Sequence, residues 1–217
     1  MIRGAVFDMD GTLLDSNPYW NLAPGAWLST LGKQAKPDLA QTIFAMTLPE
    51  AADYIIAEYA LSCTPQAVID GINEAMERFY RKDVPFKSGV PELLHALRAR
   101  GVPCAVASVT DRHLVEAVLR RFDLLDCFAA LVTTSDVGVG KQEPDVYLRA
   151  AELLGSTPPE TLVFEDALHA LRTARRAGFR TVGVYDDASA QVQAQLRALS
   201  DIYLPDFSDC SAVLTAE

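Results

Sequence analysis

Two carboxylates at the end of a short apolar segment carry the strongest chemical signal in this sequence. Residues 2–7 are mostly apolar, and the motif Asp8-Met9-Asp10-Gly11 follows them directly. Carboxylates this close repel each other unless a divalent cation neutralises them or one of them holds a proton. Asp8 is therefore a candidate nucleophile toward phosphorus, Asp10 a candidate general acid and base, and Mg²⁺ the expected cation. An ordinary Asx-type turn is the alternative interpretation.

A serine stands in an equivalent place after the second apolar segment, residues 102–107. The hydroxyl of Ser108 and the nearby backbone N–H groups could bind a phosphoryl oxygen. Capping of the next helix is the other interpretation of Ser108, and it is the favoured one for Thr110 and Asp111. We leave both interpretations of Ser108 open.

One lysine and one acidic pair complete the set of candidate residues. Lys141 lies in a loop just before an expected helix, where a compact cation could screen Asp8 and an incoming phosphate. Glu165 and Asp166 end another apolar segment, and two neighbouring anions at a buried edge need a cation. We therefore assign Asp166 to Mg²⁺, directly or through water, with Glu165 as a second acidic contact.

The composition favours a small anionic solute as the partner. The net charge is −10 and the pI is about 4.7, so we expect neither nucleic acid nor a membrane surface to bind. The four cysteines show no metal-binding spacing and are expected to be reduced thiols: Cys63, Cys104, Cys127 and Cys210. With no signal-like segment and no long apolar window, the expected location is cytoplasmic, as a monomer or weak homodimer.

These residues must be positioned by strands, and the sequence supplies six short apolar runs that alternate with helical patterns. The runs are residues 2–7, 102–107, 129–133, 161–164, 181–185 and 201–204. Continuous apolar runs of this length predict strands buried on both faces, and the alternation predicts a parallel sheet. The expected fold class is α/β, with a Rossmann-like, doubly wound core.

The first and second strands are too far apart for a single crossover helix, which predicts an inserted domain. Apolar residues at helical spacing predict helices over residues 21–31, 39–45, 50–61 and 65–82. We therefore expect an α/β catalytic core at residues 1–16 and 85–217 and an all-helical cap at residues 17–84. Gly89 lies where the chain returns from the cap to the core, and the conformational freedom of glycine predicts a hinge there.

These motifs, in this order, resemble the haloacid dehalogenase superfamily, specifically its members with a helical cap after the first motif. Phosphoglycolate-phosphatase-like and β-phosphoglucomutase-like enzymes belong to that group. The resemblance implies that Asp8 is the nucleophile and Asp10 the acid and base, with the Asp10 backbone carbonyl also a metal ligand. It implies phosphate binding by Ser108 and Lys141, and metal contacts from Asp8, Glu165 and Asp166.

The expected reaction is Mg²⁺-dependent hydrolysis of a small phosphate ester, such as a sugar phosphate, through an aspartyl-phosphate. A sugar phosphomutase is the main alternative, but Trp20 stands where mutases of this kind have a histidine, and an indole cannot shuttle a proton. A non-catalytic binding protein is the alternative of another class. Asp10 argues against dehalogenation, and no lysine can be assigned to phosphonate cleavage. Gln142 replaces a common proline after the motif lysine.

Several other residues receive no functional role. The histidines His95, His113 and His169 lie on expected helices at unrelated spacings, which argues against a zinc site. The aromatic residues Trp20, Trp27, Phe44 and Tyr54 are expected mainly in the core of the cap. A modest basic cluster, Arg78, Arg81, Lys82 and Lys87, is interpreted as a solvated helix end rather than an anion grip.

Overall fold

The computed structural model describes residues 1–43, 46 and 48–216, and the chain divides into two compact units. One unit comprises Met1–Asp15 and Pro85–Glu217, and the other comprises Ser16–Val84. The sequence placed the first boundary after residue 16, whereas the structure groups Ser16 with the helical unit. None of the helices in the described part of the chain is both long and apolar enough to cross a membrane.

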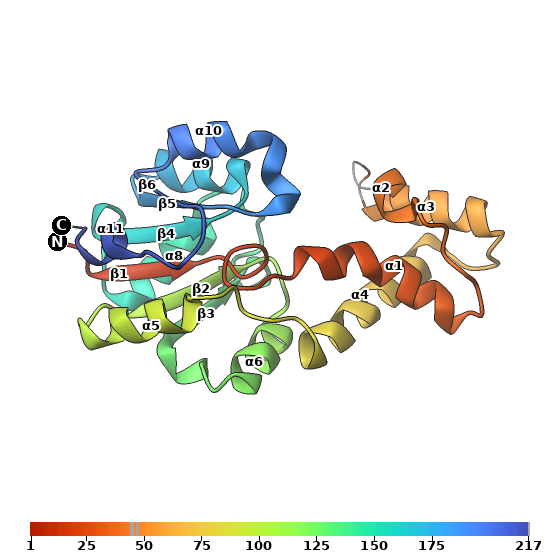
Figure 1. Ribbon diagram of the computed structural model, residues 1–217, viewed down its shortest axis with the longest axis horizontal. Coiled ribbons are helices and arrows are strands. Elements are labelled where there is room, and N and C mark those ends of the chain that lie inside the picture. Colours follow the sequence, from red (N-terminus) through yellow and green to blue (C-terminus); the bar gives the residue numbers. More distant parts are fainter. Residues whose placement is uncertain (44–45, 47, 217) are drawn as a thin grey trace. The chain divides into compact units, whose positions relative to one another are not determined.

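The larger unit contains a six-stranded sheet in which every pairing is parallel (Figure 1). The strands lie in the order β3-β2-β1-β4-β5-β6. Their bounds are β1 Gly4–Phe7, β2 Cys104–Ser108, β3 Phe128–Thr133, β4 Thr161–Glu165, β5 Arg180–Val184 and β6 Ile202–Leu204. All six predicted strands are confirmed, and so is the doubly wound α/β class.

The register of the central strands explains their apolar sequences. Val6 pairs with Ala105 on one side and with Val163 on the other, and all three are completely buried. They share one core cluster with Tyr147 and Ala174 from the covering helices. The neighbouring residue Phe7, which points to the opposite face, is buried as well. Both faces of the central strands are therefore covered, as a continuous apolar run predicts.

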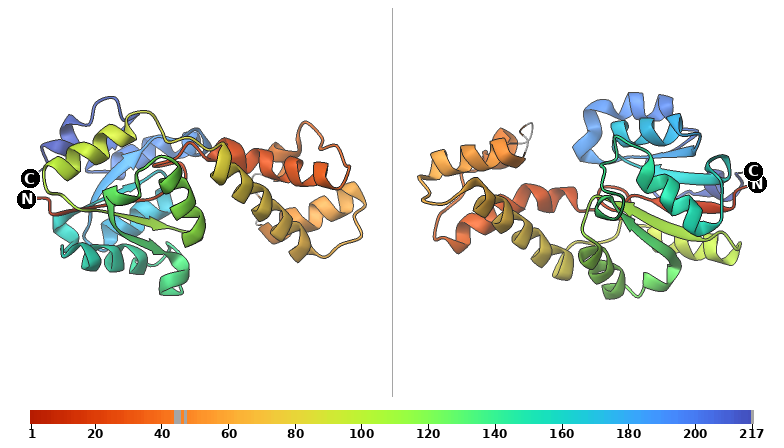
Figure 2. Two further views of the ribbon diagram at one scale, coloured as in Figure 1. Left: turned by 90° about the horizontal axis from the view of Figure 1, so that it is seen from below. Right: turned by 180° about the vertical axis from the view of Figure 1, so that it is seen from behind.

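Helices flank both faces of this sheet. Figure 2 shows α5 and α8 on opposite faces. The α-helices of the unit are α5 Val90–Ala99, α6 Arg112–Arg121, α7 Thr134–Val137, α8 Asp145–Leu154, α9 Leu168–Arg176, α10 Gln193–Leu199 and α11 Ser211–Leu214. Three 3-10 helices are η1 Leu125–Cys127, η2 Pro158–Glu160 and η3 Asp187–Val192.

The ends of these helices follow the expected stop signals, with one correction. Gly155 ends α8 in the left-handed conformation, at φ 67°. Gly89, at φ 87°, precedes α5, and a Cβ there would collide with the Phe207 carbonyl. Asp111 does precede α6, but its side chain forms no capping hydrogen bond, so the predicted side-chain cap is wrong.

The smaller unit is all-helical, with α1 Asn17–Thr30, α2 Leu39–Ile43, α3 Leu48–Tyr59 and α4 Pro65–Lys82. α4 packs against both α1 and α3. Trp27 lies buried in this core, directly against Gly71, whereas Trp20 and Tyr54 are half-buried. The prediction about Phe44 lies outside the described residues.

Two helix starts in this unit lie earlier than predicted. α1 begins at Asn17 rather than residue 21, because Pro18 in its first turn is compatible with a helix start. α3 begins at Leu48, so that Pro49 also falls in a first turn. Ser16 precedes α1, yet its buried hydroxyl has no hydrogen-bond partner and caps nothing.

Candidate active site

The site lies where the central strands β1 and β4 end side by side. These strands flank the point at which the strand order reverses, and ligands of open α/β sheets bind at the carboxyl ends of strands at such a point. The Asp8 amide donates a hydrogen bond to the Phe164 carbonyl at 3.0 Å, which fixes the end of β1 against β4. Asp8 therefore stands beside Glu165 and Asp166.

These three acidic residues form a buried cluster. Asp8, Glu165 and Asp166 each offer one carboxylate oxygen, and the three oxygens lie within 4.8 Å of one another. Among the described residues this is the group of carboxylates, histidines or thiols close enough to hold one metal ion. Oxygen donors alone suit a hard cation such as Mg²⁺.

Lys141 supplies a positive charge inside the cluster. Its Nζ donates to Asp8 Oδ1 and, at 2.6 Å, to Glu165 Oε1. The side chains of Lys141 and Glu165 are 6% and 1% exposed, so both ions are removed from water. The Tyr147 hydroxyl donates to the same Glu165 oxygen at 2.6 Å. One cation and one phenol therefore hold the cluster together from the loop before α8 and from α8 itself.

Burial and neighbouring negative charge raise the pKa values of Asp8 and Asp166. Burial, and then the Glu165 charge, raise the pKa of Asp8 well above its ordinary value, although Lys141 acts in the opposite direction. Burial and the Glu165 and Asp186 charges raise the pKa of Asp166 to about 7. Burial alone would lower the pKa of Lys141, but Asp8 and Glu165 reverse the effect and raise it, which keeps the ammonium charged.

A second observation supports a divalent cation at this cluster. Glu165 Oε1 already accepts from Lys141 and Tyr147, but Oε2 is buried without any hydrogen-bond partner. A buried, unpartnered carboxylate oxygen is costly, and a metal ion is one group that would satisfy it. The donor set and this orphaned oxygen together make Asp8, Glu165 and Asp166 a candidate metal site.

Asp10 lies beside the cluster rather than in it. Its carboxylate accepts a hydrogen bond from the Thr110 hydroxyl at 2.6 Å, and it does not belong to the group of three converging carboxylates. Gly11, at φ 75°, turns the chain away directly after it. The structure thus places Asp10 near Asp8 with its side chain oriented by a residue from the end of β2.

Ser108 ends β2 and is completely buried. Its Oγ accepts a hydrogen bond from the Thr110 backbone amide at 3.0 Å, a local turn that aims Thr110 toward Asp10. The favoured interpretation of Thr110 as a helix cap is therefore wrong, because its hydroxyl contacts a catalytic candidate. The phosphate-binding role of Ser108 stays a prediction.

Four contacts around the site were missed by the sequence reasoning. The Thr12 hydroxyl donates to Asp166 at 3.2 Å, and Lys87 pairs with Asp186 at 2.8 Å. Tyr147 and Thr110 are the other two. Position after a strand could have singled out Thr110 and Asp186, but Tyr147 lies within a helix like many core aromatic residues. Lys87 belongs to this ion pair and not to a solvated helix end, which corrects its assignment.

The remaining sequence candidates lie elsewhere. His95, His113 and His169 stand on α5, α6 and α9 and do not converge. Arg81 forms an exposed ion pair with Glu77 within α4. These residues contribute nothing to the acidic cluster.

Known proteins resemble the chain over most of its length. A family model described as haloacid dehalogenase-like hydrolase matches residues 2–178. Hexitol phosphatase B of Escherichia coli K12 is 28% identical over 214 residues, which cover 97% of this chain and 95% of that protein. A phosphorylated carbohydrates phosphatase of Thermotoga maritima is 27% identical over 202 residues, covering 91% and 94%.

The fold is similar to a solved structure of comparable length. The crystal structure of a candidate β-phosphoglucomutase from Thermotoga maritima matches with a TM-score of 0.81 and 25% identity, over 94% of each chain. The family match extends from the strand that delivers Asp8 to the end of the helix that follows Asp166. The chain therefore belongs to the haloacid dehalogenase-like hydrolases.

Proposed function

We propose that this phosphatase hydrolyses a small phosphorylated carbohydrate through an aspartyl-phosphate on Asp8, with Mg²⁺ as its cofactor. The observation that carries the proposal is the buried Asp8 carboxylate, which shares Lys141 with Glu165 at the end of β1. A carboxylate in such a place has a role in chemistry rather than in packing. The names of the two phosphatase relatives support a phosphorylated carbohydrate as the substrate.

In the first half-reaction an Asp8 carboxylate oxygen attacks phosphorus and the ester P–O bond breaks. Asp10 gives its proton to the departing alcohol oxygen, so the alcohol leaves neutral. The ammonium of Lys141 is held in reach of Asp8 and would balance the charge on the phosphoryl oxygens. Ser108 is proposed to contribute donors to the same oxygens.

In the second half-reaction water attacks the aspartyl-phosphate, and Asp10 now accepts the proton from that water. The P–O bond to Asp8 breaks, inorganic phosphate leaves, and the carboxylate of Asp8 is restored. Bound at Asp8, Glu165 and Asp166, with the Asp10 carbonyl, Mg²⁺ would supply positive charge that lowers the barrier for attack on an anionic ester. The elevated pKa of Asp8 supports this requirement, because a nucleophilic carboxylate must be deprotonated.

The test is release of inorganic phosphate from a panel of hexitol phosphates, hexose phosphates, phosphoglycolate, nucleotides and an aryl phosphate, with Mg²⁺ or with EDTA. Asp8→Asn is expected to lose turnover while keeping the fold. Asp126→Asn, which changes an exposed acid of the same unit, serves as the control and should behave as wild type. Normal turnover by Asp8→Asn, with deamidation excluded by mass spectrometry, would remove Asp8 as the nucleophile.

A sugar phosphomutase is the second candidate, and the likeness to the candidate β-phosphoglucomutase favours it. Trp20, half-buried in α1, opposes it because the indole offers one N–H donor and no base. The two candidates differ in their products. Incubation with β-glucose 1-phosphate should release phosphate if the chain is a phosphatase, and should give glucose 6-phosphate without release if it is a mutase.

A further inference from the structure

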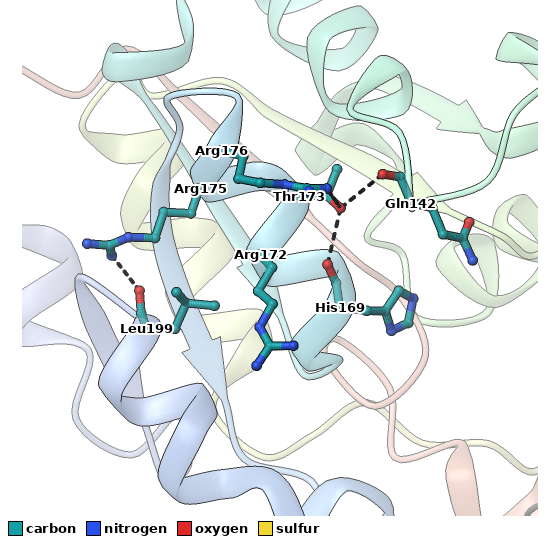
Figure 3. A pocket seen from close by; sticks show the side chains of 7 residues that line it. All are labelled: Gln142, His169, Arg172, Thr173, Arg175, Arg176 and Leu199. Carbon is teal, nitrogen blue, oxygen red and sulfur yellow. Dashed lines mark hydrogen bonds between the residues drawn. The ribbon is translucent and has the colours of Figure 1, made fainter.

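A basic pocket lies on α9 and α10, apart from the acidic cluster. Its volume is about 420 Å³, and its lining includes Arg172, Arg175, Arg176 and His169 (Figure 3). Leu199 contributes an apolar wall. The pocket shares no lining residue with the acidic cluster of Asp8, Glu165 and Asp166.

The charge of this segment is opposite to that of the chain. Between Asp166 and Asp186 the sequence contains four arginines and one histidine and no acidic residue, whereas the whole chain has a net charge of −10. Three of the four arginines line the pocket. A concentration of one sign of charge in a concave place attracts ligands of the opposite sign.

Two of these arginines are available to a ligand. Arg172 donates to the Gln195 side chain at 3.2 Å, and Arg176 contacts the Thr173 hydroxyl at 3.5 Å. Neither forms an ion pair within the described part of the chain, although Arg175 pairs with Asp201 at 3.4 Å. The guanidinium groups of Arg172 and Arg176 therefore keep most of their donors uncommitted. Five N–H donors in a planar fork match the oxygens of phosphate.

We propose that this pocket is a second anion site, which binds the phosphate group of a phosphorylated small molecule. Arg172 and Arg176 would contact the phosphate, and Leu199 with the aliphatic stems of the arginines would cover the organic part. The volume lies within the range of about 300–1,000 Å³ found for small-molecule sites. Inorganic phosphate shares the same recognition chemistry, and the experiment separates the two sources.

The pocket is connected to the catalytic lysine through one buried hydroxyl. The Thr173 hydroxyl lies 3.2 Å from the carbonyl of Gln142 and 3.1 Å from the carbonyl of His169, and its one proton is shared between these two acceptors. Gln142 both lines the pocket and follows Lys141 directly. Thr173 is only 3% exposed. Binding that shifts α9 would therefore reach the loop that holds Lys141 against Asp8. We include in the proposal that occupancy of the pocket alters turnover.

Isothermal titration calorimetry in EDTA tests the site without hydrolysis. The probes are inorganic phosphate, glucose 6-phosphate and glucose, added to wild type and to Arg172→Gln/Arg176→Gln. The matched control is Arg98→Gln/Arg100→Gln, which removes the same charge from exposed positions of the same unit. We expect the pocket variant to lose one glucose 6-phosphate site, or to bind it about tenfold or more weakly, and the control to match wild type.

Several outcomes would overturn the site. The first is equal affinity of the pocket variant and wild type for glucose 6-phosphate, and the second is no binding of any probe to wild type. The third is an equal loss of affinity in the control variant, which would show an effect of net charge. Stronger binding of inorganic phosphate than of glucose 6-phosphate would overturn the organic ligand. Unchanged phosphate release in Mg²⁺ at saturation of the pocket would overturn the coupling to Lys141.

Chemical modification of wild type keeps the test independent of variant folding. Phenylglyoxal modifies accessible arginines, and peptide mass spectrometry locates them. Glucose 6-phosphate should protect Arg172 and Arg176 but leave Arg98 and Arg100 reactive. Equal reactivity of Arg172 and Arg176 with and without the ligand would contradict the proposal, whether or not the chain is a phosphatase.

Discussion

Replacing Lys141 by methionine tests whether one ammonium group holds the acidic cluster in the fold. The change keeps an unbranched side chain that is one atom shorter and removes its charge. Asp8 and Glu165 then stay buried without their shared cation. Breaking a buried ion pair from one side costs about 3–5 kcal/mol, a large part of the 5–15 kcal/mol that stabilises a typical domain. We expect a loss of this size in metal-free protein at pH 8.

The loss should become smaller as the pH falls. Without Lys141 the folded-state pKa of Asp8 rises further, because Lys141 is the group that lowers it. Stability is therefore retained below the unfolded pKa of a carboxyl and is lost as the pH rises toward the folded value. The deficit relative to wild type is therefore small near pH 4 and complete near pH 8. Glu165→Gln in the Lys141→Met background should recover part of it, because one uncompensated charge is gone.

Urea unfolding in EDTA provides the measurement. Both tryptophans, Trp20 and Trp27, lie in the helical unit, so far-UV circular dichroism must follow the sheet unit. Lys33→Met, an exposed change in the helical unit, is the control. A loss below about 1 kcal/mol at pH 8, or strict additivity of Lys141→Met and Glu165→Gln, would refute the reasoning.

Three further perturbations have defined outcomes. Thr110→Val should lower kcat by about 10–100-fold and shift the pH profile, because Asp10 loses a hydrogen bond, and Thr110→Ser should restore both; equal kinetics would remove Thr110 as a positioning residue. Metal-free protein should lose roughly 2–4 kcal/mol as the pH rises from about 4 to about 7, since the pKa of Asp166 is raised by folding to about 7. Asp166→Asn should flatten this loss in urea titrations, and an unchanged slope would contradict the assignment. Gly71→Ala should lower stability by about 1–3 kcal/mol, measured by tryptophan fluorescence, because its Cβ would collide with Trp27; an unchanged urea midpoint would refute this packing.

Strands could be predicted from the sequence because each one has a simple physical signature. A parallel strand covered on both faces needs a continuous apolar run, and the six predicted segments contain such runs. Asp8, Ser108 and Asp166 became candidates for the same reason, since they stand at or just after the ends of such strands. Helix starts were less accurate, as at Asn17, because proline in a first turn looks like a helix breaker in the sequence.

Contacts between side chains from distant segments could not be predicted. Tyr147 donates to Glu165 because α8 packs over the end of β4, and that approach depends on the tertiary fold. Thr110 was assigned to a cap because its hydroxyl is near a helix start, whereas its real partner, Asp10, lies 100 residues away. The arginines of α9 were missed because their spacing is that of an ordinary solvated helix face.

Both the excess of acidic residues at the site and the proposed reaction require additional positive charge there. Three carboxylates, Asp8, Glu165 and Asp166, face the single ammonium of Lys141, so the buried cluster keeps an excess of negative charge. A phosphate ester adds further negative charge and could not approach such a site unaided. A divalent cation at the three carboxylates would cancel the excess, and the raised pKa values of Asp8 and Asp166 would then fall, which frees Asp8 as a nucleophile. In the proposed mechanism, metal binding and activation of Asp8 are therefore the same electrostatic event.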